Sequence, residues 1–133
     1  MTKVPSTPRI TIAGVARNCA PFLPGVFNNF ELLRSEFPEL RFVFVENDSD
    51  DGTQQLLAAW CKNRPGYAHM IDLRGLGQLP IRTLRLELAR NAYLQWIKTQ
   101  RPWAESEYLM VLDMDGIGTY PLALRQIHDS LRF

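Results

Sequence analysis

The chain has 133 residues, of which 46% are hydrophobic, 11% aromatic and 22% charged, a composition typical of one folded domain. The net charge of +1 excludes the strong basic field that holds a nucleic-acid backbone. The sequence lacks both an apolar run of about 20 residues and the apolar stretch of a signal peptide at its start. We therefore expect a cytoplasmic protein that has no transmembrane segment and no nucleic-acid partner.

The first third of the chain predicts two strands with a helix between them. An apolar run rich in β-branched residues, 10–16, is typical of a strand covered on both faces. Apolar residues then recur every three or four positions until Pro38, which predicts an amphipathic helix. These positions are Leu23, Val26, Phe27, Phe30, Leu33 and Phe37. Residues 41–45 predict a second buried strand, which leads directly into the polar loop 46–53.

The middle of the chain predicts a second helix and a weaker third strand. The Asp and Thr that end the polar loop suit a helix N-terminus. We expect this helix to turn Leu56, Leu57 and Trp60 inward and to end before Pro65. Residues 69–73 then predict a third strand.

The last third predicts a long helix and a fourth strand. A loop at 75–80 precedes a predicted helix over 82–98. The apolar run at 108–112 then predicts the fourth strand. Spacing by four residues predicts an inward stripe on the helix formed by Leu84, Leu88, Ala92 and Trp96.

Strands that alternate with helices predict one α/β domain over residues 1–133, because parallel strands joined by helices form right-handed βαβ units. We expect three α/β/α layers and a mainly parallel sheet with strand order 3-2-1-4. Residues 1–8 would form a polar lead, and 117–133 would form a loop and a helix. In such sheets, ligands bind beyond the carboxyl ends of the strands.

Polar residues follow three of the predicted strands, so we expect them to converge on one crevice. They are Arg17 and Asn18, the residues from Glu46 to Asp51, and the pair Asp113 and Asp115. Two carboxylates one residue apart can share a hard divalent cation that also reaches phosphate oxygens. This predicts Mg²⁺ or Mn²⁺ rather than zinc, which prefers nitrogen and sulfur ligands.

Two arginines of the long helix are candidate ligands for phosphate. Arg82 and Arg90 are eight residues apart and lie roughly 80° from each other around a helix, so both can face one ligand. Arginine binds phosphate oxygens through two parallel hydrogen bonds, which makes a diphosphate a natural partner. The alternative is a salt bridge to a local carboxylate such as Glu87, and for Arg85 we favour that alternative.

Three motifs together resemble the nucleotide-binding half of a GT-A glycosyltransferase. They are 46–53 after a strand, 89–91 on a helix, and 112–115 after another strand. The most similar variants are family-2-like enzymes and the capsule-associated mannosyltransferases, and the similarity spans about residues 9–116. It implies a hexosyltransferase that uses Mn²⁺ or Mg²⁺ and a UDP- or GDP-sugar donor, with an unknown glycan or other acceptor.

The resemblance also implies roles for individual residues. The end of the first strand would lie against the base and ribose, and Asn47 occupies a position that commonly hydrogen-bonds the base. Arg90 matches an arginine near the diphosphate, while Asp113 and Asp115 match the motif whose metal bridges the diphosphate. The full set for donor binding is Val15, Ala16, Arg17, Glu46, Asn47, Asp48, Arg82, Arg90 and Asp113.

Only residues 117–133 follow the metal motif, whereas a complete GT-A domain continues with strands that form the acceptor pocket. The sequence therefore identifies no catalytic base; Asp129 belongs to a helical pattern, and neither His128 nor His69 is expected to be a metal ligand. Three explanations stay open. The chain is truncated after the metal motif and binds the donor without transferring it, it completes its sheet as a homo-oligomer, or the resemblance misleads.

Two other functions compete with sugar transfer. The sequence Asp113 to Gly116 also matches the signature of haloacid-dehalogenase-type phosphatases, in which the first Asp is a nucleophile and the second a general acid. That signature normally lies at the start of the fold, whereas here it begins at residue 113, so this hypothesis is weaker than sugar transfer. The other is a noncatalytic nucleotide-binding or interaction module, since a fold by itself does not establish catalysis.

Overall fold

A computed structural model describes residues 8–112 and residue 114. Its strands are β1 (Ile10–Ala16), β2 (Arg41–Glu46), β3 (Ala68–Asp72) and β4 (Tyr108–Val111). Its α-helices are α1 (Leu23–Glu36), α2 (Thr53–Lys62) and α3 (Arg82–Thr99). Three short 3₁₀ turns join them: η1 (Ala20–Phe22), η2 (Leu76–Gln78) and η3 (Trp103–Glu105). Each strand and helix predicted within these residues lies within two residues of its expected bounds. Residues 1–7 of the predicted polar lead and the loop and helix predicted over 117–133 lie outside the described residues.

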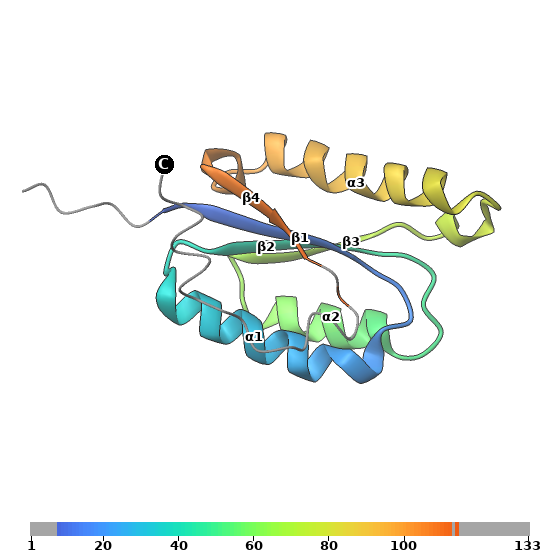
Figure 1. The fold of residues 1–133 in the computed structure, drawn as a ribbon, viewed down its shortest axis with the longest axis horizontal. Coiled ribbons are helices and arrows are strands. Elements are labelled where there is room, and N and C mark those ends of the chain that lie inside the picture. The colour runs from blue at the N-terminus through green and yellow to red at the C-terminus, as the bar shows by residue number, and fades with distance from the viewer. Residues whose placement is uncertain (1–7, 113, 115–133) are drawn as a thin grey trace, which may run out of the picture.

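The four strands form one parallel sheet in the order β3-β2-β1-β4. Helices α1 and α2 cover one face of this sheet and α3 covers the other, as Figure 1 shows. Because β1 is central, it is hydrogen-bonded on both sides and is almost fully buried. The prediction of a three-layer α/β/α fold with strand order 3-2-1-4 is confirmed.

The face beneath α1 and α2 holds an aromatic core. Phe30 of α1 packs against Phe42 and Phe44 of β2, with ring centroids 4.9 and 5.5 Å apart. Trp60 of α2 joins them with its ring 5.1 Å from that of Phe42. Such rings bury a large apolar area and so fix both helices on the sheet. The expectation that Leu56 also points inward is wrong, since its side chain is 42% exposed and the buried face of α2 passes through the neighbouring Leu57.

The opposite face is covered by α3, but not by the predicted stripe. Ala89 and Tyr93 are buried against Ala13, Val43 and Val45 of the sheet. Of the residues expected to point inward, Leu84 is 38% exposed and Leu88 is 40% exposed. The other two, Ala92 and Trp96, are only partly buried. A second apolar stripe lies one residue further along α3, and its small alanine and flat tyrosine ring fit the sheet surface more closely.

The end of β4 is held against β1 at a glycine. A Cβ atom added to Gly14 would lie 3.0 Å from the carbonyl oxygen of Leu112 and 3.1 Å from Cγ and Sδ of Met114. Only a residue without a side chain lets these two residues approach β1 so closely. Gly14 therefore permits the close approach of Leu112 and Met114 to β1.

No helix within residues 8–112 is long and apolar enough to cross a membrane.

Candidate functional site

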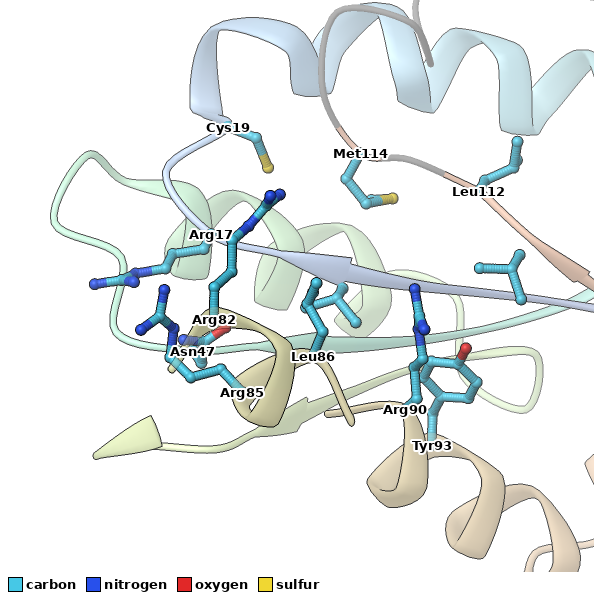
Figure 2. Close-up of a pocket in the computed structure, with 12 residues that line it drawn as sticks. Arg17, Cys19, Asn47, Arg82, Arg85, Leu86, Arg90, Tyr93, Leu112 and Met114 are labelled. Carbon is cyan, nitrogen blue, oxygen red and sulfur yellow. The ribbon is translucent and has the colours of Figure 1, made fainter. Parts of the chain in front are cut away.

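A pocket of about 290 Å³ lies beyond the carboxyl ends of β1 and β2 (Figure 2). One wall is the N-terminal half of α3, and another is the chain that follows β4. The lining residues are Val15, Arg17, Cys19, Asn47, Arg82, Arg85, Leu86, Arg90, Tyr93, Val111, Leu112 and Met114. This is the edge at which open parallel sheets bind ligands.

Five of the residues predicted to bind the donor meet at this pocket. Val15 and Arg17 come from the end of β1, Asn47 follows β2, and Arg82 and Arg90 belong to α3. Figure 2 shows both α3 arginines extending toward the sheet. The structure thus brings together side chains from three separate segments, although their binding roles stay predictions.

Three other predicted donor residues do not line the pocket. Ala16 is fully buried, and its carbonyl oxygen accepts a hydrogen bond from the N–H of Asn47 at 3.3 Å. Glu46 is also buried, and its carboxylate accepts a hydrogen bond from the N–H of Ser49 at 2.9 Å. The carboxylate of Asp48 accepts one from the N–H of Gly75 at 2.8 Å. In this structure these carboxylates therefore shape the loops beside the pocket.

Side-chain hydrogen bonds join the loop after β2 to the loop after β1. The Thr53 hydroxyl donates to Asp51 Oδ1 at 2.6 Å and accepts from the N–H of Cys19 at 2.9 Å. The other oxygen of Asp51 accepts from the N–H of Ala20 at 3.1 Å. These bonds, with that from Thr53 first, hold the pKa of Asp51 below its ordinary value, because they stabilise the ionised carboxylate.

Asn18 makes a second connection between the same two loops. Its N–H donates to Ser49 Oγ, and its side-chain oxygen accepts from the N–H of Asp50, both at 2.9 Å. Asn18 has a φ of +49°, in the left-handed region that asparagine tolerates better than most residues. The two loops thus form one hydrogen-bonded unit beside the pocket.

The arginines of the pocket differ in how they are held. Among the residues that the structure describes, Arg17, Arg82 and Arg90 form neither an ion pair nor a side-chain hydrogen bond. Arg85 instead donates through Nη1 to the carbonyl oxygen of Leu79. The expectation that Arg85 pairs with a local carboxylate is therefore wrong within the described chain. Its position three residues after Arg82, on the same side of a helix, was the signal that it faces the pocket.

Two further polar residues of the pocket are almost fully buried. Asn47 is 4% exposed, and its side-chain amide makes no hydrogen bond to another described residue. Tyr93 was not predicted to be in the site; burial raises the pKa of its phenol, and the positive charge of Arg90 partly opposes this. The amide of Asn47 can both donate and accept a hydrogen bond, which leaves it able to bind a ligand in the pocket.

The predicted metal ligands Asp113 and Asp115 lie outside the described residues. The chain neighbours of Asp113 are described, and both Leu112 and Met114 line the pocket. Within 8–112 and at 114, nowhere do three His, Cys, Asp or Glu side chains gather as a possible metal site. The choice of Mg²⁺ or Mn²⁺ therefore remains a prediction.

The fold and pocket define an α/β protein with a cationic pocket at the strand ends. No family model matches the chain, and no curated protein matches it. A solved structure that resembles it is that of the mannosyltransferase PcManGT from Pyrobaculum calidifontis in complex with GDP-Man and Mn²⁺. The likeness has a TM-score of 0.46 and 21% sequence identity and covers 65% of this chain. The chain spans 25% of the length of that protein.

Proposed function

We propose that this pocket binds the diphosphate and nucleoside of a UDP- or GDP-sugar, and that the protein is glycosyltransferase-like. The observation that carries the proposal is the convergence of Arg17, Asn47, Arg82 and Arg90 on one pocket at the strand ends. Arginines suit phosphate oxygens, and a buried amide suits the edge of a nucleobase. The three GT-A-like motifs support the same ligand.

The nucleoside and the diphosphate of the donor each have candidate partners. Val15 and Arg17 would lie against the base and ribose, and Asn47 would hydrogen-bond the base. Arg82 and Arg90 would bind the diphosphate, where their fixed charge offsets the negative charge that develops on a departing nucleoside diphosphate. Asp113 and Asp115 would hold Mn²⁺ or Mg²⁺, which supplies further neutralisation of that charge.

Transfer itself needs an acceptor, and in inverting members of the resembled family it also needs a carboxylate base. Among the described residues that line the pocket there is no Asp or Glu. The second candidate function is a noncatalytic module that binds the donor nucleotide without transferring the sugar, since a fold by itself does not establish catalysis.

Calorimetric titration with UDP and GDP, with and without Mn²⁺, tests donor binding. We expect Mn²⁺ to strengthen binding, and the double variant Asp113→Ala/Asp115→Ala to abolish that gain. Arg90→Ala should weaken nucleoside diphosphate binding far more than nucleoside binding. Arg101→Ala is the matched control, because this exposed arginine does not line the pocket. Equal Mn²⁺ dependence in the double variant would refute the metal assignment.

Incubation with UDP-glucose or GDP-mannose distinguishes the two candidate functions. Release of free nucleoside diphosphate that depends on Asp113 would support an enzyme. Binding of the intact donor without release would support the noncatalytic module. Absence of binding by every nucleotide tested would refute both.

A further inference from the structure

We propose that Arg82, Arg85 and Arg90 of α3 form a diphosphate site that holds its ligand without a divalent cation. The inference rests on the proposed function, because it concerns the same pocket. It adds Arg85 to the binding residues. It also assigns to the arginines a share of the binding affinity that does not depend on the divalent cation predicted at Asp113 and Asp115.

The pocket is rich in positive charge. Four guanidinium groups line a pocket of about 290 Å³, and no Asp or Glu is among its described lining residues. Arginine stays protonated in proteins, so these groups repel one another when the pocket holds no anion. A multiply charged anion removes that repulsion and gains several charge-assisted hydrogen bonds at once.

The N-terminus of α3 also lies at the pocket. Arg82 is the first residue of this 18-residue helix, and the preceding Ile81 provides no side-chain cap for the free N–H groups. Arg82 and Arg85 both line the pocket, so the first turn of α3 borders it (Figure 2). The positive end of the helix dipole therefore adds to the arginine charge.

Arg85 fixes the position of this first turn. Its Nη1 donates to the carbonyl oxygen of Leu79, which connects α3 to the loop before it. A guanidinium carries five N–H donors, so this bond leaves others for a ligand. Arg85 is thus anchored on one side and can bind phosphate on the other, as a prearranged group rather than a free side chain.

The α3 side of the pocket of about 290 Å³ is lined by Arg82, Arg85 and Arg90. Guanidinium groups bind phosphate oxygens through paired, charge-assisted hydrogen bonds. We therefore assign the phosphates of the ligand to this side of the pocket.

The test is calorimetric titration of the full chain with inorganic pyrophosphate in EDTA. We expect saturable one-to-one binding, with inorganic phosphate at least about tenfold weaker because it reaches fewer guanidinium groups. Arg82→Gln and Arg90→Gln should each weaken pyrophosphate binding by about tenfold or more. Arg101→Gln, which makes the same charge change outside the pocket, should leave it unchanged. Binding that needs Mn²⁺, or that falls equally in Arg101→Gln, would overturn the proposal.

Thermal unfolding separates a binding role from a structural one. Because Arg82 and Arg90 have no partners among the described residues, their Gln variants should melt at the wild-type temperature or above it. Pyrophosphate should raise the melting temperature of the wild type more than that of either variant. Variants that melt well below the wild type in the absence of ligand would show a structural role and overturn the assignment.

The same titrations separate this inference from the proposed function. If UDP or GDP binds with Mn²⁺ but pyrophosphate does not bind in EDTA, the cation-independent site is refuted and the proposed function stands. If pyrophosphate binds in EDTA but neither nucleotide binds more tightly than pyrophosphate in any buffer, the arginine site stands and the proposed function is refuted.

Discussion

Replacement of Gly14 by alanine tests how the end of β4 is positioned. The added Cβ would lie 3.0 Å from the backbone oxygen of Leu112 and 3.1 Å from two atoms of Met114. Optimal separations between such atoms are about 3.5–4.0 Å, so the neighbouring chain must move. The backbone oxygen belongs to the strand end itself and cannot rotate away as a flexible side chain can.

Two opposing effects set the magnitude. Alanine in place of glycine within a strand normally stabilises a protein by about 0.5–1 kcal/mol, because it restricts the unfolded chain. Overpacking of a well-filled interior costs about 1–3 kcal/mol. The second effect is larger, so Gly14→Ala should lower the free energy of unfolding by about 0.5–2 kcal/mol.

Urea unfolding followed by tryptophan fluorescence measures this change. The control is the same substitution in a Met114→Ala background, which removes two of the three close contacts. In that background Gly14→Ala should cost less, by about 0.5 kcal/mol or more, because residues in contact are not additive. If Gly14→Ala stabilised the protein, or cost the same in both backgrounds, the close approach of β4 to β1 at this point would be refuted.

Four further outcomes are expected. Thr53→Val should destabilise the fold by about 1–3 kcal/mol in urea unfolding, because it leaves the N–H of Cys19 without its acceptor; Thr53→Ser should restore most of the loss. Burial raises the pKa of the Cys61 thiol to about 12, so at pH 8 Cys61 should be alkylated much more slowly in the folded protein than in the urea-unfolded chain, and equal rates in the two states, measured at Cys61 by peptide mass spectrometry, would contradict this. Burial lowers the pKa of His69, so the unfolded chain binds a proton at a higher pH than the folded protein does. The free energy of unfolding should therefore fall as the pH drops below about 6.5. His69→Gln should reduce the difference between urea titrations at pH 7.5 and pH 5.5. In the described sheet, β4 is an edge strand with Val111 56% exposed, so we expect self-association, and a monomeric mass in light scattering at high concentration would count against it.

The sheet was predictable because its strands are short apolar runs with little ambiguity. The central strands are buried on both faces, so residues 10–16 and 41–45 are nearly continuous apolar runs, and their short length and their β-branched and aromatic residues favour a strand over a helix. The orientation of α3 was not predictable in the same way. Leu88 and Ala89 both belong to apolar stripes with helical spacing, and only the shape of the sheet beneath decides which is buried.

The site was partly predictable from the rule that ligands bind at strand ends. That rule led to Arg17 and Asn47, and helical spacing led to Arg82 and Arg90. It did not distinguish a loop carboxylate that faces a ligand from one that binds backbone N–H groups. Glu46 is of the second kind in this structure, because its carboxylate is bonded to the loop that follows it.

The two sides of the pocket differ in stiffness. One side is formed by the two loops that Asn18 and Thr53 join, and the other is formed by α3. On the loop side, hydrogen bonds through Asn18 and Thr53 hold the backbone that carries Arg17, Cys19 and Asn47, so a ligand that contacts this side orders little of the backbone on arrival. On the α3 side, Arg82 and Arg90 are long and have no partners within the described chain, so the ligand must immobilise them. Contacts to the loop side should therefore set which ligand shape is accepted, whereas rearrangement of the arginines should govern how fast a bound anion leaves.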